Sequence, residues 1–296
     1  MGAREGRPKS PFWAKGRAYR PFVKDPGPFT KRVHDYQSLG PAFKYFGGKS
    51  KLAKRIVRQL PEHTTFVEPF AGGASVTLAK PPSEKEVLND KRADVINFYR
   101  HVKSGKKIHL VRPSRHRFYQ VRDKPETQRT PGEFLLLQSK SFGGHGQSYA
   151  DGSGSKGEKL MKNYDRYWRR LQKTTLLNTD YKQAIDRYDS PSTLFYLDPP
   201  YPETIQDYTN YGHMIPSVET IRQTVDGIKG RVMLSYPDTP EVRRAFPESK
   251  FHVKRFRLYK PLTSFNPGPR TRSELLILNY TPSARNHWHL LERVAG

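Results

Sequence analysis

Residues 194–201, Leu-Phe-Tyr-Leu-Asp-Pro-Pro-Tyr, constrain the fold of this chain more than any other stretch. The first four are apolar and partly aromatic, which is typical of a short buried strand. Two prolines follow and end the strand, because proline has no N–H for the ladder. The residue before a proline is held extended, so Asp198 is restricted as well. We therefore expect an acid, a proline carbonyl and an aromatic ring at the carboxyl end of a strand, where open α/β sheets bind ligands.

A strand, a glycine turn and a helix start are predicted upstream, at residues 65–78. This is the outline of the first βα unit of a doubly wound sheet. Its glycines do not match the Gly-x-Gly-x-x-Gly pattern, which disfavours a dinucleotide ligand. Glu68 would stand at the end of the strand, where it is well placed to meet the ammonium of a zwitterionic ligand.

Paired glycines also occur at Gly47 and Gly48, before apolar residues at helical spacing. Such glycines allow a backbone to approach a ligand closely, and a helix N-terminus behind them favours an anionic group. The alternative is a simple turn before a helix. The spacing does not match a phosphate-binding loop of the Gly-x-x-x-x-Gly-Lys-Ser/Thr kind.

Two further short strands are predicted at residues 86–90 and 176–181, each with an acid near its end. Asp90, after the glycine turn, stands where an acid commonly holds ribose hydroxyls. It is also a candidate helix cap, because residues 93–99 have helical periodicity, and both roles can coexist. After the proline turn, helices are expected at 217–228 and 239–246, a strand at 231–236 and an antiparallel pair at 251–258 and 274–280.

The charge balance indicates a polyanionic partner. Lys and Arg number 53 against 28 acids, which gives a net charge of +25 and favours nucleic acid over a membrane surface. No apolar run is long enough to span a bilayer, and no secretory signal is recognisable, so we expect an intracellular location. Cysteine is absent, which excludes disulfides, thiolate nucleophiles and cysteine-ligated zinc.

Two regions concentrate the basic residues. Residues 1–40 mix nine Lys and Arg with many prolines, and we interpret them as a disordered arm that is either a solvated tail or a phosphate-tracking segment. Residues 104–175 combine basic stretches with a loop rich in glycine and serine, which fits an inserted DNA-recognition region, or else a solvated surface excursion. The candidate DNA-binding side chains are Arg115, Arg117, Arg122, Lys140, His145 and Gln147.

Five segments, at 44–49, 68–73, 89–90, 178–181 and 198–201, together resemble the motifs of Dam-type DNA adenine-N6 methyltransferases, whose recognition domain is inserted before the catalytic motif. The resemblance covers roughly residues 41–285 and is weakest in the insertion. It implies an α/β fold, a Rossmann-like S-adenosylmethionine-dependent methyltransferase with a seven-stranded mixed sheet and an inserted, mainly helical DNA-recognition domain. The expected domains are a catalytic domain at 41–103 and 176–285, the insertion at 104–175, the arm at 1–40 and a C-terminal tail at 286–296.

The resemblance also implies roles for individual residues. Tyr45 and Lys49 would flank the pocket of the cofactor S-adenosylmethionine, and Asp90 would hold its ribose. Glu68, Phe70 and Gly72 would form the floor, and Asp180 would meet the cofactor adenine. The expected catalytic residues are Asp198, Pro199, Pro200 and Tyr201.

The chemistry expected of the catalytic motif follows from the weakness of its nucleophile. The lone pair of an adenine amino group is delocalised into the ring, so the site must draw it outward. The Asp198 carboxylate and the Pro199 carbonyl offer two acceptors for the two N–H bonds, and Tyr201 would stack on the base. The target base must leave the duplex, so base flipping is implied. The scattered histidines show no metal-ligand spacing, and no metal is expected.

Three hypotheses are carried forward. The first is a DNA adenine-N6 methyltransferase acting on double-stranded DNA, as a monomer or as a dimer on the DNA. The second is the same chemistry on cytosine N4 or on adenine in RNA. The third is a non-catalytic nucleic-acid-binding relative. The cellular setting expected for the first is the cytoplasm, either nucleoid-associated or virus-encoded inside a host cell. The recognition sequence stays open, since the pattern Ser-Phe-Gly-Gly-His-Gly at 141–146 differs from that of GATC-reading members.

Overall fold

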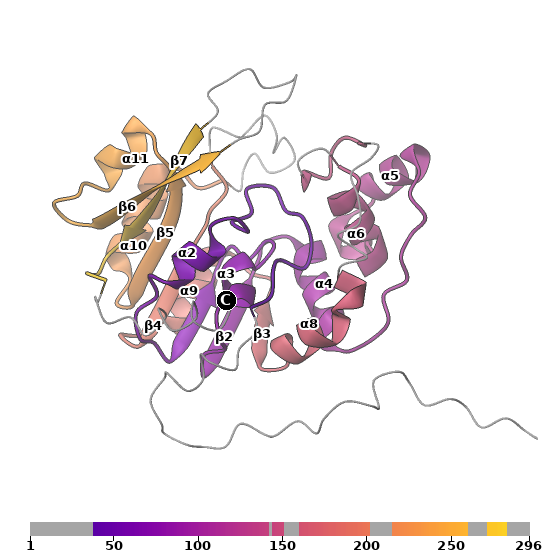
Figure 1. Ribbon diagram of the computed structural model, residues 1–296, viewed down its shortest axis with the longest axis horizontal. Coiled ribbons are helices and arrows are strands. Elements are labelled where there is room, and N and C mark those ends of the chain that lie inside the picture. The colour runs from indigo at the N-terminus through magenta and orange to yellow at the C-terminus, as the bar shows by residue number, and fades with distance from the viewer. Residues whose placement is uncertain (1–37, 142–143, 151–159, 202–214, 260–270, 283–296) are drawn as a thin grey trace, which may run out of the picture.

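The structure is a computed structural model, and it describes residues 38–141, 144–150, 160–201, 215–259 and 271–282 (Figure 1). The predicted arm lies outside these residues except for its last three positions, and the predicted C-terminal tail also lies outside them. Of those three positions, Leu39 is buried in the core and its N–H donates to the carbonyl of Leu78 at 2.9 Å. The folded region therefore begins before residue 41.

The described residues form one seven-stranded mixed sheet in the order β3-β2-β1-β4-β5-β7-β6. Its strands are β1 (Thr65–Glu68), β2 (Lys85–Asn89), β3 (Thr174–Leu177), β4 (Thr193–Leu197), β5 (Arg231–Pro237), β6 (His252–Tyr259) and β7 (Thr271–Leu278). The first five run parallel, while β7 is antiparallel to both β5 and β6. This confirms the predicted α/β fold with a seven-stranded mixed sheet. The chain moves outward from β1 to β3 and then returns to β4, so the strand order reverses between β1 and β4. Ligands of open α/β sheets bind at such a reversal.

The centre of the sheet is buried on both faces, as expected of parallel strands. In β4, Leu194 and Tyr196 pack into one apolar cluster while Phe195 and Leu197 pack into another. Successive side chains of a strand point to opposite faces, so the two clusters lie on either side of the sheet. The first cluster contains residues of α2 (Ala53–Val57) and α3 (Ser75–Ala79), and the second contains residues of α9 (Tyr181–Tyr188), α10 (Val218–Gly227) and α11 (Pro240–Ala245).

Between β2 and β3 the regular elements of the described residues are helical. They are α4 (Ala93–Lys103), α5 (Arg115–Arg122), the 3-10 turn η2 (Glu126–Gln128), α6 (Pro131–Ser139) and α8 (Tyr164–Leu171). In Figure 1 they gather beside β3, on the opposite side of the molecule from α10 and α11. An apolar cluster joins α4, α6 and α8 to Leu39 and Phe43, so this region shares a core with the segment before α2.

A buried ion pair also ties these helices to the sheet. Arg170 of α8 donates to the carboxylate of Glu86 on β2, and its guanidinium also donates to the Thr77 carbonyl. Lys80 contacts the same carboxylate at 2.6 Å. Burial acts to raise the pKa of Glu86, but Lys80 and Arg170 outweigh it and lower the pKa to about 2. The three charges therefore hold α8 against β2 and α3.

The strand predicted at residues 176–181 was wrong in its extent. The strand is Thr174–Leu177, and Asp180 is instead the N-cap of α9, where its carboxylate accepts a hydrogen bond from the Lys182 N–H at 3.0 Å. Asn178 also leaves the strand, because its side chain donates to the carbonyls of Asp90 and Lys91. Asn and Asp favour caps and turns over strand interiors, which accounts for the early end of β3. The helices and strands predicted after residue 190 are confirmed within one or two residues at most ends, β7 beginning three residues early.

Candidate active site

A pocket of about 1060 Å³, including its open mouth, lies at the carboxyl ends of β1 and β4. It is thus at the reversal of the strand order. All of the predicted cofactor and catalytic residues line it: Tyr45, Lys49, Glu68, Phe70, Gly72, Asp90, Asp180, Asp198, Pro199, Pro200 and Tyr201. The fold therefore brings residues from five separate segments of the sequence to one site.

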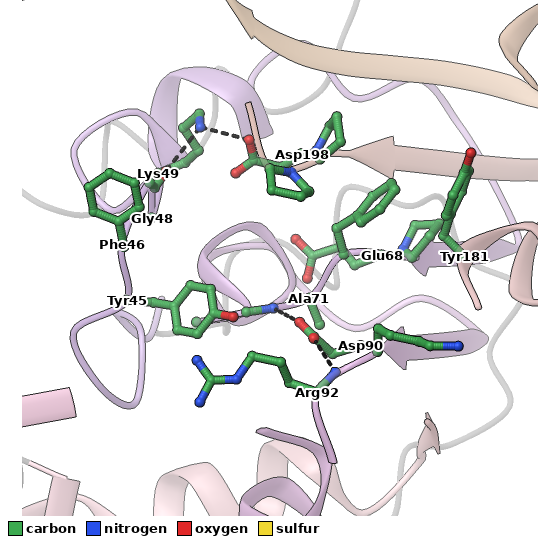
Figure 2. Close-up of a pocket in the computed structure, with 18 of the residues that line it drawn as sticks. Tyr45, Phe46, Gly48, Lys49, Glu68, Ala71, Asp90, Arg92, Tyr181 and Asp198 are labelled. Atoms are coloured by element: carbon green, nitrogen blue, oxygen red, sulfur yellow. Dashed lines mark hydrogen bonds and ion pairs between the residues drawn. The ribbon is translucent and has the colours of Figure 1, made fainter. Parts of the chain in front are cut away.

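Asp198 is held at one of its two carboxylate oxygens. Its Oδ1 accepts hydrogen bonds from the Lys49 ammonium at 2.7 Å and from the Tyr201 hydroxyl at 2.9 Å. Figure 2 shows the Lys49 contact and the carboxylate facing the pocket. Burial raises the pKa of Asp198 above its ordinary value, while the ion pair with Lys49 acts in the opposite direction. The carboxylate is thereby fixed in orientation, with Oδ2 available to a ligand.

Lys49 binds more than one partner in this corner of the pocket. Its ammonium donates to the Gly47 carbonyl at 3.0 Å and to the Tyr201 hydroxyl at 2.5 Å, and lies 3.2 Å from Oε1 of Glu274. Lys49 was predicted to flank the cofactor, and it does line the pocket, but its ammonium lies at the catalytic motif.

Tyr201 is buried, with its ring packed on Tyr236 at a centroid distance of 5.3 Å. Its hydroxyl bonds both Asp198 and Glu274, the latter at 2.8 Å. One local signal marks Glu274 in the sequence, an acid at the start of an apolar strand, where burial requires a partner. That partner cannot be read from the sequence, because it comes from a segment more than seventy residues away.

Glu68 is buried at the end of β1, where its Oε2 accepts a hydrogen bond from the Thr77 hydroxyl at 2.6 Å. Burial raises its pKa to about 8, despite the opposing effect of the Thr77 bonds. At neutral pH this carboxyl is therefore largely protonated in the free protein. A cationic group entering the pocket would favour its ionised form.

Asp90 closes the glycine turn through two backbone bonds. Its Oδ2 accepts from the Gly72 N–H at 2.8 Å and its Oδ1 from the Arg92 N–H at 2.9 Å. Burial raises its pKa to about 6, against these two bonds. The cap residue of α4 is Arg92 and not Asp90, although the Asp90 carboxylate does satisfy the N–H of that residue. Gly72 has φ +43° and lies against the Tyr45 ring.

Aromatic rings and a further acid line another part of the pocket. Phe70 and Tyr181 face each other at 4.8 Å between centroids, and Asp180 stands next to Tyr181 at the start of α9. Arg92 lies 5.9 Å from the Tyr45 ring. The predicted site residues did not include Tyr181, although it belongs to the segment 178–181 that carries the family resemblance, or Arg92, whose residue type carries no signal outside its tertiary position.

The six predicted DNA-binding residues lie apart from the pocket lining, on α5 and the segment from Lys140 to Ala150. Arg122 donates to the Gln147 carbonyl at 3.4 Å, and Arg115 lies over the Tyr149 ring at 5.6 Å, so helix and loop pack together. Arg117 pairs with buried Glu133. His145 stacks at 3.5 Å on Phe46, which does line the pocket. The Lys140 carbonyl closes the loop by accepting from the Ala150 N–H.

The described residues also bear on metal sites and membrane spans. They contain no group of three or more His, Cys, Asp or Glu side chains placed to hold a metal ion. Across the same ranges, none of the helices combines the length and the apolar character that crossing a membrane requires.

Comparison with known protein families identifies the reaction that takes place in this pocket. Residues 45–257, well over half of the chain, match the model of the D12 class N6 adenine-specific DNA methyltransferases. The chain belongs to this family. The enzyme therefore methylates the N6 amino group of adenine in DNA and takes the methyl group from S-adenosylmethionine. This confirms the chemistry of the first of the three hypotheses and gives no support to the other two.

Individual relatives agree with the family. The methyltransferase is 28% identical over 189 residues to the type II methyltransferase M.CviBI of Paramecium bursaria Chlorella virus NC1A, covering 57% of this chain and 72% of the relative. It is 26% identical over 270 residues to a DNA adenine methylase of Vibrio cholerae, covering 81% of this chain and 95% of the relative. It is also 26% identical over 243 residues to the DNA N-6-adenine-methyltransferase of Escherichia phage P1, covering 72% of this chain but 32% of that longer protein.

Proposed function

We propose that the enzyme methylates a flipped-out adenine at a particular sequence in double-stranded DNA, with Asp198 as the residue that engages the target amine. The observation that carries this proposal is the one-sided anchoring of Asp198. Lys49 and Tyr201 both bind Oδ1, so Oδ2 is presented to the pocket in a fixed orientation. A rigid turn of two prolines follows directly and holds the acid in place.

Oδ2 of Asp198 and the carbonyl of Pro199 would accept the two N–H bonds of the adenine amino group. Two acceptors draw the amine towards a tetrahedral nitrogen, whose lone pair then points at the methyl group. S-adenosylmethionine, when bound, supplies that methyl group as an electrophile. Holding the two reactants in line contributes much of the remaining rate enhancement. Asp198 and Pro199 thus act on the amine and not on the cofactor.

The remainder of the pocket fits the cofactor. Glu68 is a buried carboxyl without an ionic partner among its described hydrogen bonds, which suits the cofactor ammonium. Asp90 offers a carboxylate beside the glycine turn for ribose hydroxyls, as acids after such turns commonly do. Phe70 and Tyr181 offer flat faces for the cofactor adenine, with Asp180 at their edge. A side chain at Gly72 would clash with the pocket wall, since a Cβ there would lie 2.7 Å from the Tyr45 ring.

The helical region between β2 and β3 would read the DNA sequence. It places basic and amide side chains on α5 and on the loop after α6, and such side chains can bond base edges in the major groove. The excess of basic residues across the chain would bind phosphates without regard to sequence. We expect a monomer, or a dimer on the DNA, acting in the cytoplasm of its own or a host cell. The flipped base would enter the pocket beside Asp198.

Transfer of a labelled methyl group tests the proposal directly. The enzyme would be incubated with tritium-labelled S-adenosylmethionine and duplex DNA, and the DNA then hydrolysed to nucleosides and separated. We expect the label in N6-methyldeoxyadenosine, and sequencing of DNA methylated in parallel should place the modified base at one short recurring sequence. Label in N4-methyldeoxycytidine, or a strong preference for RNA under the same conditions, would contradict the proposal. Absence of any label with intact cofactor binding would leave only a binding function.

A further inference from the structure

A second carboxylate lies behind the catalytic one. Glu274 on β7 is buried, with 2% of its surface exposed, and it does not line the pocket. Its Oε1 lies 2.8 Å from the Tyr201 hydroxyl, 3.2 Å from the Lys49 ammonium and 3.2 Å from the Ser235 hydroxyl. Asp198 Oδ1 contacts the same ammonium and the same Tyr201 hydroxyl. Two carboxylates therefore share one lysine and one tyrosine.

The shared hydroxyl makes the two acids competitors. A tyrosine hydroxyl has one proton to donate, so it cannot donate to Asp198 and to Glu274 at the same moment. The Lys49 ammonium has three protons, and the described acceptors for them include Gly47, Asp198 and the Tyr201 oxygen. A lysine and a tyrosine that bound Asp198 alone would withdraw charge from its carboxylate. Glu274 draws both of these groups towards itself.

We propose that Glu274 is a positioning residue that keeps the Asp198 carboxylate a strong hydrogen-bond and proton acceptor. This inference rests on the proposed role of Asp198 towards the target amine. In the reaction, N6 forms a bond to the methyl carbon as the bond from that carbon to sulfur breaks, and N6 then gives up one proton. Asp198 would accept that proton at Oδ2. A carboxylate with a like charge behind it accepts the proton more readily.

The groups around Asp198 support the direction of this effect. Glu274 acts to raise the pKa of Asp198, while Lys49 and Tyr201 act to lower it. Glu68 and Tyr196 also face Asp198 electrostatically, from β1 and from β4 itself. Glu274 is joined to Asp198 through Lys49 and Tyr201 and stands outside the pocket lining. Its effect is therefore expected on turnover and its pH dependence, with the cofactor site left intact.

Glu274→Gln removes the second charge and keeps the shape of the side chain. We expect its kcat on duplex DNA to fall at least about tenfold, while cofactor affinity changes by less than about threefold. The acidic limb of its pH profile should move to lower pH, because Asp198 loses a like-charged neighbour. Glu274→Asp keeps the charge. It should therefore retain much of the wild-type kcat, and the acidic limb of its pH profile should lie where it does in the wild type.

A matched control removes a carboxylate close to β7 but outside this cluster. Asp238 follows β5, its N–H donates to the Ser273 carbonyl, and its carboxylate pairs with Arg243 and Arg255. Asp238→Asn should leave kcat and the pH profile unchanged. Thermal melting of each variant reports whether it is folded. If Glu274→Gln does not fold, Tyr201→Phe replaces it, and because Asp198 then loses a donor, its limb should move to higher pH.

Carbon NMR of aspartate-labelled protein gives a measure that needs no turnover. The Asp198 signal is assigned by its loss in Asp198→Asn and then titrated in the wild type and in Glu274→Gln. A lower Asp198 pKa in the variant supports the proposal even if the preferred DNA is unknown. An unchanged Asp198 pKa, or a folded Glu274→Gln with wild-type kcat and pH profile, would overturn it. Failure of the wild type to methylate DNA would instead count against the proposed function.

Discussion

At the scale of single residues, the site contains buried carboxyl groups. We expect each of them to bind protein groups on one side and the ligand on the other. Among the described residues, Asp198 accepts two hydrogen bonds, both at Oδ1, and we propose that its Oδ2 engages the substrate. Glu68 accepts a hydrogen bond from the Thr77 hydroxyl and forms no ion pair among the described residues, although the charge of Lys80 acts to lower its pKa. Burying a carboxylate is costly, and burial outweighs these effects and raises the pKa of Glu68 to about 8, which favours the protonated carboxyl at neutral pH.

Asp198→Asn should abolish methyl transfer while leaving cofactor binding within a few-fold. The amide keeps the shape of the side chain but removes the negative charge that engages the amine. We expect turnover on duplex DNA to fall by at least about 100-fold, which corresponds to about 2.7 kcal/mol of barrier. Calorimetry of S-adenosylmethionine binding provides the comparison. Turnover retained within tenfold would show that Asp198 is not the group that engages the amine.

Cofactor binding should release a proton from Glu68. Its pKa of about 8 in the free protein falls when an ammonium arrives, so at pH 7 the carboxyl loses its proton on binding. Affinity should therefore rise as the pH rises towards 8, and the release should vanish by about pH 9. Calorimetry in buffers of different ionisation enthalpy measures the release. Glu68→Gln should bind more weakly and release no proton; equal release from wild type and variant would place the ammonium elsewhere.

The same raised pKa affects stability without ligand. Folded Glu68 holds its proton up to about pH 8, whereas the unfolded chain releases it near the ordinary value of 4.5. Stability from this group is therefore greatest at acidic pH and is lost as the pH rises between these values. Glu68→Gln should consequently be less sensitive to pH than the wild type over this window, as denaturant unfolding at about pH 5 and about pH 8 would show.

At the scale of elements, the pocket is a set of turns held at the ends of strands. The turn after β1 depends on Gly72, whose φ of +43° and contact with the Tyr45 ring leave no room for a side chain. Side-chain contacts also connect the helical region between β2 and β3 to the turns that line the pocket. Asp94 of α4 binds both Arg92, which lines the pocket, and Arg129, whose guanidinium also donates to the Arg122 carbonyl at the end of α5.

Gly72→Ala should destabilise the protein by about 1–3 kcal/mol and weaken cofactor binding, because both the backbone angle and the Tyr45 ring oppose a Cβ. Gly227→Ala is the matched control. It lies in α10, no atom stands within 4 Å of its added Cβ, and it should be neutral or stabilising by up to about 1 kcal/mol. Denaturant unfolding and calorimetry compare the two. Equal stability of both variants would show that the turn adapts freely.

At the scale of the whole molecule, we expect different parts of the chain to provide the affinity for DNA and the choice of DNA sequence. Residues 1–37 lie outside the described structure and contain nine Lys and Arg against three acids. The helical region beside the pocket offers the side chains that can read base edges. We therefore assign non-specific affinity to the arm and sequence choice to residues 104–175.

Deletion of residues 1–37 should weaken binding to all duplexes alike and flatten the dependence of log affinity on log salt, by about 0.9 for each phosphate that the arm neutralises in the full chain. The deletion must stop at 37, since Leu39 is part of the core. The methylated sequence, read from modified genomic DNA, should stay the same. A changed sequence would move recognition into the arm, and an unchanged salt slope would show that the arm is only a solvated tail.

Most strands and turns could be predicted from the sequence because they depend on local chemistry, whereas most residues of the pocket were predicted from the resemblance of five segments to the motifs of Dam-type methyltransferases. Prolines after Asp198 end a strand wherever it lies, and acids or glycines at strand ends converge when the strands are parallel. The folded chain was needed to show that Asp180 caps a helix, that Lys49 reaches Asp198 and that Glu274 stands behind them. The last two contacts join residues that are far apart in the chain, and no local pattern records which distant side chain will satisfy a buried charge.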